Sequence, residues 1–166
     1  MHRVSSRFAV AALAIVAASA TASARAADAV DPAVEVAVGK GRCIEAQVAD
    51  KPVACVANPG VIRVLYRSGR SVILLGLAGK AAIAFVAEPD AAANASESVL
   101  DITRVRVGRD GSAPPVPVTG TCRLTWSADR AAWRDVACDA ADAKGRRYVL
   151  RFEPSGPLEI EREARP

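Results

Sequence analysis

Carboxylate pairs are the side chains of this sequence that could act together as a general acid and a general base. Asp129 with Asp135 is one such pair, and Asp139 with Asp142 is another. Two carboxylates whose pKa values differ can donate and accept protons at one substrate. Each of these aspartates, however, lies in an expected turn or solvated stretch, where Asp is common because it hydrogen-bonds the nearby backbone. We therefore predict no catalytic residues, and a carboxylate hydrolase without histidine is the third function that we consider.

Histidine is the residue that most limits the chemistry of this chain. The sequence contains one histidine, His2, so residues 27–166 contain none. This excludes Ser-His-Asp and Cys-His catalytic arrangements from that part of the chain. It also excludes histidine-ligated zinc, copper and haem sites. No S-x-x-K or G-x-S-x-G motif supports another nucleophile. We predict a protein that is not an enzyme and that has no metal and no cofactor.

Four cysteines are present, namely Cys43, Cys55, Cys122 and Cys138. An even number of cysteines in an exported chain indicates disulfide bonds. Four free thiols or a zinc site of four cysteines are the alternatives. Eleven residues separate Cys43 from Cys55, and fifteen separate Cys122 from Cys138. The C-x-x-C pair of zinc ribbons and thioredoxin-like sites is absent. We expect two structural disulfides.

The first 26 residues are typical of a cleavable signal peptide. Arg3 and Arg7 form a basic start, residues 8–20 are apolar, and Ala24-Arg25-Ala26 has the small-x-small form of a cleavage site. The apolar run is shorter than the roughly 20 residues that a membrane-spanning helix needs. We therefore predict a periplasmic or secreted protein that has no membrane span after cleavage. Ala22-Ser23-Ala24 is a second candidate cleavage site.

Cleavage would change the charge of the protein. The whole chain has a formal net charge of +4, and the signal segment holds Arg3, Arg7 and Arg25 but no acidic residue. Residues 27–166 therefore carry 19 basic and 18 acidic residues, a net charge of +1. Nucleic-acid binding depends on a strong positive field. Nucleic acid is accordingly not an expected partner.

Alternating apolar and polar residues extend over most of the mature sequence. Such alternation predicts strands with one apolar face, which we expect to be turned to the core. Val72 to Leu75 is apolar without interruption and predicts a strand that is buried on both faces. The alternating apolar positions are Val34, Val36 and Val38; Ile44, Ala46 and Val48; Leu124 and Trp126; Tyr148, Leu150 and Phe152; and Leu158 and Ile160.

Turn sequences separate these runs at short intervals, among them Asn58-Pro59-Gly60 and Pro154-Ser155-Gly156. Short strands with regular turns predict an all-β fold, either an antiparallel sandwich or a barrel-like meander, after the N-terminal signal helix. Residues 27–40 are expected to form an N-terminal extension or the first strand. Residues 41–163 are expected to form a single β domain.

Three segments depart from regular alternation. Asp90 to Glu97 is predicted to be a surface connection. The alternation changes phase between Ile102 and Val105, which predicts a β-bulge near Thr103. Pro114, Pro115 and Pro117 predict that residues 113–118 form an edge strand or an extended segment, because proline cannot donate a ladder hydrogen bond.

The two cysteine segments resemble one another. Each contains G-x-C, then an Ala-Asp-basic turn, then V-A-C, with 79 residues between the first cysteines. The pattern predicts a stapled hairpin used twice, in half-repeats 41–88 and 120–163; chance similarity between two cysteine hairpins is the alternative. Paired positions of a hairpin are close enough for a disulfide. This favours the pairs Cys43–Cys55 and Cys122–Cys138 over crossed pairings.

Aromatic and basic residues are the candidate binding contacts. Trp133 lies in the middle of a hairpin, where it is either an exposed contact or a lid over the core, whereas Trp126 is expected in the core. Two basic clusters are either solvated outer faces or contacts for an anionic polymer. They comprise Arg63, Arg67 and Arg70 with Tyr66, and Arg146, Arg147 and Arg151 around Tyr148.

These observations predict an exported, non-enzymatic β-domain with a binding or structural role at the cell envelope. Its partner would be an envelope protein or a polysaccharide. The alternative is a secreted inhibitor of a hydrolase that presents a rigid loop such as Ala128 to Arg134. Fold alone does not decide between these functions.

Overall fold

The computed structural model describes residues 31–93, 96–109 and 113–163, so the predicted signal peptide lies outside the described residues. This part of the chain is almost entirely β-strand. No helix in it is long and apolar enough to cross a membrane. The elements are β1 (Ala33–Val48), β2 (Lys51–Pro52), β3 (Gly60–Tyr66), β4 (Ser71–Leu77), the short 3-10 turn η1 (Ala78–Lys80), β5 (Ala81–Ala93), β6 (Glu97–Gly108), β7 (Val116–Trp126), β8 (Trp133–Asp142), β9 (Arg147–Pro154) and β10 (Glu159–Arg162).

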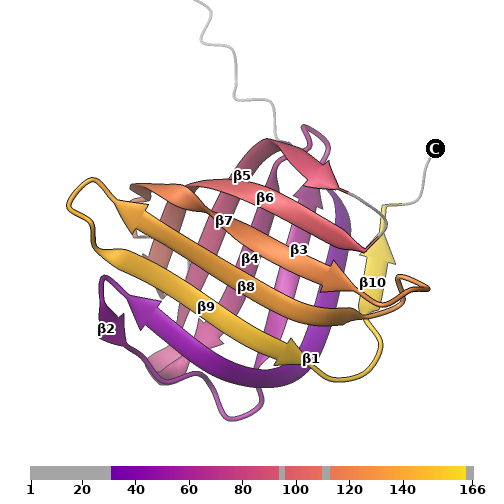
Figure 1. Cartoon of the computed structure of the whole chain (residues 1–166), viewed down its shortest axis with the longest axis horizontal. Coiled ribbons are helices and arrows are strands. Elements are labelled where there is room, and N and C mark those ends of the chain that lie inside the picture. Colours follow the sequence, from indigo (N-terminus) through magenta and orange to yellow (C-terminus); the bar gives the residue numbers. More distant parts are fainter. Residues whose placement is uncertain (1–30, 94–95, 110–112, 164–166) are drawn as a thin grey trace, which may run out of the picture.

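Eight of these strands close into an antiparallel barrel in the order β1-β3-β4-β5-β6-β7-β8-β9. Strand β1 closes the barrel because residues 33–40 pair with β3 and residues 41–48 pair with β9. Figure 1 shows β6 to β9 crossing in front of β3 and β4. The short strands β10 and β2 are added beside β1. The prediction of an all-β antiparallel fold is confirmed, and the barrel is the form that it takes.

Strand β1 changes partner near Gly41. A Cβ atom at this position would lie 2.2 Å from the carbonyl oxygen of Glu153 on β9, so the two backbones can approach closely only because the residue is glycine. A register shift between Cys43 and Glu45 follows in the same pairing. Bulges increase local twist and bend a strand. These two features let one long strand serve both edges of the barrel.

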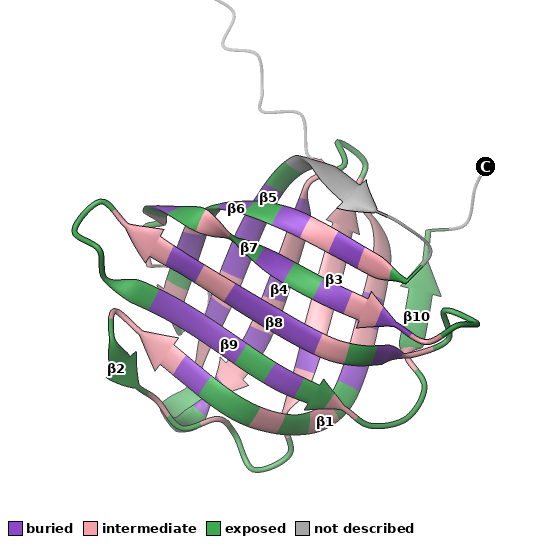
Figure 2. Cartoon of the chain, in the orientation of Figure 1, coloured by how far each residue is buried: buried purple, intermediate pink, exposed green. Residues whose placement is uncertain are grey.

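The barrel interior is filled by buried side chains, which alternate with less buried ones along much of β4, β6 and β7 (Figure 2). An eight-stranded barrel has an interior just wide enough to be filled in this way. Phe85, Ile73, Leu124 and Leu150 are fully buried there, together with Val136. The core therefore lies inside the closed sheet.

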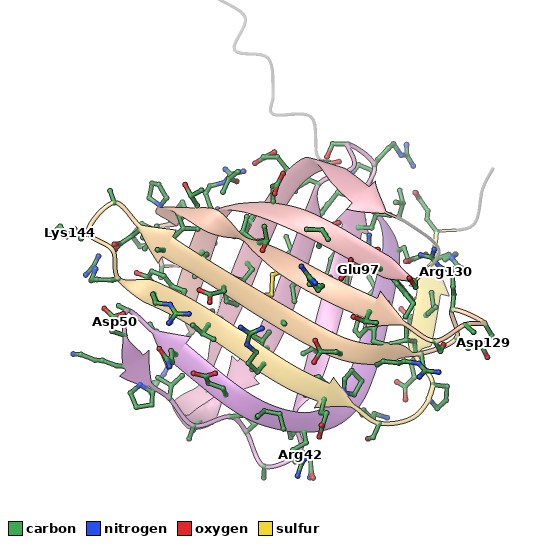
Figure 3. The ribbon with its side chains drawn as sticks, viewed as in Figure 1. Arg42, Asp50, Glu97, Asp129, Arg130 and Lys144 are labelled. Atoms are coloured by element: carbon green, nitrogen blue, oxygen red, sulfur yellow. A yellow bond between two sulfur atoms is a disulfide. The ribbon has the colours of Figure 1, made fainter. Side chains whose placement is uncertain are left out.

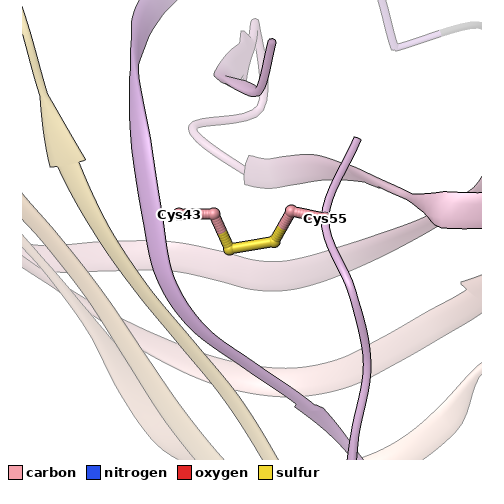
Figure 4. Close-up of a disulfide and its surroundings, with 2 residues drawn as sticks. All are labelled: Cys43 and Cys55. Carbon is pink, nitrogen blue, oxygen red and sulfur yellow. A yellow bond between two sulfur atoms is a disulfide. The ribbon is translucent and has the colours of Figure 1, made fainter. Parts of the chain in front are cut away.

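The structure contains both locally paired disulfides, as the spacing of the cysteines predicted. Cys122 and Cys138 face one another on β7 and β8, and both are 0% exposed. Cys43 on β1 is bonded to Cys55, which lies in the connection between β2 and β3 (Figure 4). The first disulfide thus holds a connection against the barrel wall, whereas the second links two neighbouring strands inside it.

The prediction for strand β1 is wrong about which face is buried. Ala37 is 0% exposed and faces the core, whereas Val36 and Val38 are half-buried and face outward. The prediction that Val72 to Leu75 is buried on both faces is also wrong. Ile73 and Leu75 are fully buried, but Val72 and Leu74 are only half-buried on the outer side. Alternation identified the strands without showing which side is the inside.

The segments that depart from alternation have mixed outcomes. The bulge at Thr103 is confirmed, since Val86 pairs with Arg104 and Ala87 pairs with Ile102. The surface connection expected at residues 90–97 is wrong, because β5 extends to Ala93 and β6 begins at Glu97. Residues 116–118 are extended, as one of the two alternatives predicted. They belong to β7, which has β6 and β8 as neighbours and is not an edge strand. Pro117 is accommodated because the pairing of β7 with β8 begins only at the next residue.

The expected boundary at residue 41 falls inside a strand, since β1 runs without a break from Ala33 to Val48. The two cysteine hairpins differ in their second arms. The first continues only as the short β2, whereas the second continues as the full strand β8. The duplication of this motif stays a prediction.

Candidate functional site

An apolar surface covers the outside of the barrel over β1, β3, β4 and β5. The strand register places Val36, Val64, Val72 and Val86 in one row. A second row contains Val38, Ile62, Leu74 and Ala84. Residues opposite one another in an antiparallel sheet have side chains that touch on one face. We call these eight residues the outer apolar face.

Two grooves hollow the outer apolar face and meet at Leu74. The larger has a volume of about 670 Å³, and Val38, Ile62 and Leu74 lie among its lining residues with Val56 and Pro59 of the β2–β3 connection. The smaller has a volume of about 420 Å³ and is lined by Val72, Leu74, Ala84 and Val86 on its apolar side. Residues of β3 and β4 line both grooves, and these strands lie behind β7 to β9 in Figure 1.

Cationic side chains border the smaller groove. Arg70, Arg104 and Arg106 line it together with Tyr66. The Arg70 guanidinium lies 4.1 Å from the centre of the Tyr66 ring and 3.4 Å from an Asp31 carboxylate oxygen. Arg104 forms an ion pair with Glu88.

Arg106 differs from its two neighbours, because no described side chain forms an ion pair with it. The Lys40 ammonium, on the wall of the larger groove, lies 2.5 Å from a Glu159 oxygen. Most cations at the rim of the grooves therefore already have a carboxylate partner, and Arg106 carries the charge that a partner would meet.

A contiguous apolar patch on the outside of a soluble protein usually marks an interaction site. Core packing does not account for this one, because the interior is filled from the other side of the same strands. Tyrosine and arginine at its border are enriched at protein interfaces, where lysine and glutamate are depleted. The outer apolar face is therefore the candidate functional site.

The β7–β8 connection, which contains the loop predicted to be rigid, is tightly hydrogen-bonded. The Asp129 carboxylate accepts hydrogen bonds from the Ser127 hydroxyl at 2.6 Å and the Ala131 amide at 3.1 Å. The Ser127 hydroxyl in turn accepts a hydrogen bond from the Ala132 amide at 3.0 Å. Arg130 has a left-handed backbone (φ 57°), and its guanidinium lies 4.7 Å from the centre of the Trp126 ring. Figure 3 shows Asp129 and Arg130 at the end of the barrel opposite Asp50 and Lys144.

Replacing Asp129 with Ala is expected to loosen this loop, whereas Asp129→Asn keeps an acceptor oxygen. The hydrogen bond from Ser127 lowers the pKa of Asp129 most strongly. Because its pKa is lowered in the folded protein, the Asp129 carboxylate contributes its full stabilisation at pH values above the ordinary aspartate pKa of about 3.9. The contribution is lost as the pH falls through the lower pKa of the folded protein. Hydrogen exchange of the Ala131 amide measures the loosening of the loop, and the pH dependence of its chemical shift measures the titration of Asp129. An Ala131 amide that is indifferent to Asp129→Ala would contradict this assignment.

Trp133 is not an exposed binding contact, so that prediction is corrected. The side chain is 2% exposed, and its ring packs edge-on against Trp126 with ring centres 5.9 Å apart. Gly39 makes room for it, since a Cβ atom there would lie 2.8 Å from the indole carbon Cε3. Trp133 is therefore a lid over the core, and Trp126 is a core residue as expected.

Of the aspartates in the two expected pairs, Asp139 and Asp142 each contact an arginine. The Asp142 carboxylate accepts a hydrogen bond from Nε of Arg146 at 2.7 Å, and this contact lowers the pKa of Asp142. Asp139 forms an ion pair with Arg147. Within the described ranges, no group of three His, Cys, Asp or Glu side chains could hold a metal ion.

The two basic clusters are divided by the fold. Arg63 does not face outward: its side chain is 14% exposed at one end of the barrel interior, which corrects the expected solvated position. Arg67 and Arg70 stay at the outer border. Around the buried Tyr148, ion pairs neutralise Arg146 and Arg147, while Arg151 is exposed on β9.

The two intramolecular disulfides fit an oxidising, exported environment. The chain matches no protein-family model, no curated protein and no solved structure to a significant degree. Sequence reasoning missed the outer apolar face, although apolar residues at both parities of β3 and β4 signal it.

Proposed function

We propose that this protein is an exported, non-enzymatic binding protein that docks a protein partner of the cell envelope on its outer apolar face. The observation that carries the proposal is the two paired rows of apolar side chains, half-buried except for the buried Val86, with two grooves that meet at Leu74. Interfaces of this kind place a desolvated apolar centre inside a polar rim. The disulfides and the predicted signal peptide support a place outside the cytosol.

A protein partner fits this surface better than a lipid bilayer does. Proteins that lie on a membrane insert protruding apolar side chains into the headgroup region. The floor residues of the grooves, Leu74 and its neighbours, are half-buried below walls formed by Val56, Pro59 and Lys40. A hollow surface accepts a segment that protrudes from a partner.

The border of the grooves indicates the charge of that segment. Arg106 has no acidic partner among the described residues, and Arg70 and Arg104 lie beside the same groove. Complementary charges at the rim raise the association rate and exclude wrong partners. We therefore infer a partner segment whose apolar side chains are flanked by carboxylates.

The inhibitor alternative has less support. A segment that binds in an extended form pairs through its backbone, whereas Arg130 has a left-handed backbone and stacks on Trp126. The hydrolase alternative also has little support, since Asp129 and Asp142 have lowered pKa values and are occupied by hydrogen bonds. A general acid needs a raised pKa near the working pH.

A pair of synthetic peptides tests the proposed chemistry. In one peptide leucines alternate with glutamates, and in the other the same leucines alternate with lysines. We expect the acidic peptide to bind the full chain at least about tenfold more tightly, a difference of roughly 1.4 kcal/mol. Its affinity should fall with added salt, because rim charges are screened. Fluorescence polarisation of labelled peptides measures both values.

Arg106→Glu should remove this preference, while Arg151→Glu on the outside of β9 is the matched control and should leave it unchanged. Equal binding of both peptides, or none, would contradict the proposed partner chemistry. Flotation with vesicles and capture on polysaccharide test the other two partner classes. If the chain binds vesicles or polysaccharide and Leu74→Asp abolishes that binding, the partner is a membrane or a glycan and not a protein.

A further inference from the structure

Arg63 is a charged residue in the interior of the barrel. It lies opposite Ala37 on β1 and Ile73 on β4, which are both 0% exposed. Its side chain is 14% exposed, so most of its charge is removed from water. Burial lowers the pKa of Arg63, and the charge of Arg130 lowers it further. Arginine nevertheless stays protonated in proteins, so a buried cation is present here.

The ion pair of Arg63 with Glu35 is long and involves only one end of the guanidinium. Nη1 lies 3.9 Å from an oxygen of Glu35, beyond hydrogen-bond distance. Glu35 is shared, because its other oxygen accepts a hydrogen bond from Nε of Arg162 at 2.8 Å. Nε of Arg63 is buried and has no hydrogen-bond partner. An unpaired buried donor on a charged group costs more than an ordinary hydrogen bond contributes.

A second unpaired donor lies at the same end of the barrel. Nε1 of Trp133 is buried without a partner, whereas Nε1 of Trp126 donates to the Ser98 hydroxyl at 3.1 Å. The Trp133 ring packs over Gly39, which is two residues from Ala37, the strand neighbour of Arg63. We call this region the Trp end, defined by Arg63, Trp126, Arg130 and Trp133.

Arg63 shares its carboxylate partner with a second cation. Glu35 also pairs with Arg162, and the charge of Arg130 is close enough to lower the pKa of Arg63. The Glu35 side chain is 18% exposed and that of Arg63 is 14% exposed, so part of each side chain reaches the protein surface. Replacing a poorly paired buried charge with an apolar residue of similar size often stabilises a protein. A position that retains such a charge is a candidate for function.

We propose that the Trp end binds a small oxyanion, a carboxylate or a phosphate, through Arg63 and the indole N–H of Trp133. The Nε–H and Nη2–H groups of a guanidinium form an edge that matches two oxygens of an oxyanion. In Arg63 this edge is the one that Glu35 does not use. The oxyanion would supply acceptors to both unpaired donors and a negative charge that Arg63 does not share with Arg162. This site is separate from the outer apolar face.

Tryptophan fluorescence tests the proposal, because both tryptophans of the chain lie at the Trp end. The full chain is titrated with sodium acetate and with sodium phosphate, and sodium chloride at equal ionic strength corrects for screening. We expect a saturable change in emission with at least one oxyanion and no saturable change with chloride. Acetate and phosphate distinguish the carboxylate from the phosphate. A wild-type protein whose emission responds equally to all three salts overturns the proposal.

Arg63→Met identifies the responsible side chain. Its apparent dissociation constant for the oxyanion should rise at least about tenfold. Arg67→Met is the matched control, since Arg67 is exposed and its Nη2 lies 2.7 Å from an oxygen of Glu163. Unchanged titration of Arg63→Met would overturn the assignment. Thermal stabilisation of the wild-type chain by the oxyanion gives a second readout that does not depend on the folding of a variant. The Leu74→Asp variant should titrate normally, so the failure of either proposal is recognised separately.

Discussion

Leu74→Asp is expected to abolish docking on the outer apolar face and to leave the barrel folded. Leu74 lies where the two grooves meet, so its replacement introduces a charge into both. Central apolar contacts of an interface commonly contribute about 2 kcal/mol or more, which corresponds to a loss of roughly 30-fold in affinity. A carboxylate should lose more, because it would also repel an acidic partner. The measurement is the affinity of the acidic peptide, compared between variant and wild type.

Ile44→Asp is the matched control for this substitution. Ile44 is 54% exposed and does not line either groove, so it makes the same chemical change on another part of the outside. Unchanged circular dichroism and denaturation midpoints would show that both variants are folded. If Leu74→Asp binds as tightly as Ile44→Asp, the outer apolar face is not the docking surface.

Trp133→Ala is expected to have the largest effect on stability of any single substitution considered for this chain. The side chain is 2% exposed, and its removal leaves a cavity beside Trp126 and Gly39. Truncating a buried tryptophan costs about 3–5 kcal/mol. Urea denaturation followed by circular dichroism measures the loss directly. A binding experiment on this variant would therefore report unfolding in addition to any lost contact.

Trp133→Phe separates packing from hydrogen bonding. Phenylalanine keeps most of the apolar volume and removes an indole N–H that has no partner in the protein. Its cost should therefore be well below that of Trp133→Ala. A Trp133→Ala variant as stable as the wild type would show that this ring is not the lid over the core.

The strands and the disulfide pairs were predictable because they follow local rules. Alternation has a period of two residues whichever side is buried, so it located the end of β7 and most of β9. The pairing of Cys122 with Cys138 follows from the geometry of one hairpin. The bulge at Thr103 appears in the sequence as a change of phase.

The orientation of β1 and β4 could not be derived in the same way. A strand with apolar residues on both faces has no sequence feature that distinguishes the inside from the outside. In β1 the small residues Ala37 and Gly39 face the interior, where the Trp133 ring lies against Gly39. The larger valines, which alternation assigned to the core, face outward instead. For this reason, alternation alone did not predict the outer apolar face.

The positions of Arg63 and Trp133 also depend on contacts between distant parts of the chain. Arg63 alternates with apolar residues on β3 and resembles a solvated position in the sequence. Its inward direction follows from its pairing with Ala37 and Ile73, which are both buried in the barrel interior. Trp133 begins β8 and is covered by its position over β1.

A closed barrel is a suitable support for an apolar outer surface. Closure leaves no long free strand edge among its eight strands, so the exposed apolar rows do not lie beside unpaired backbone groups. The Cys43–Cys55 disulfide holds the β2–β3 connection, which forms one wall of the larger groove through Val56 and Pro59. The surface is therefore fixed before a partner binds, which lowers the entropic cost of association.

The central claim is tested most directly by photo-crosslinking from the outer apolar face in the cells that produce the protein. A photoreactive amino acid replaces Val72 in the full chain, and a second variant carries it at Ile44. The account predicts an adduct from position 72 only, lost on Leu74→Asp, whose partner peptide contains apolar residues flanked by Asp or Glu. Adducts only with lipid, glycan or a second copy of this chain, or equal adducts from both positions, would contradict it.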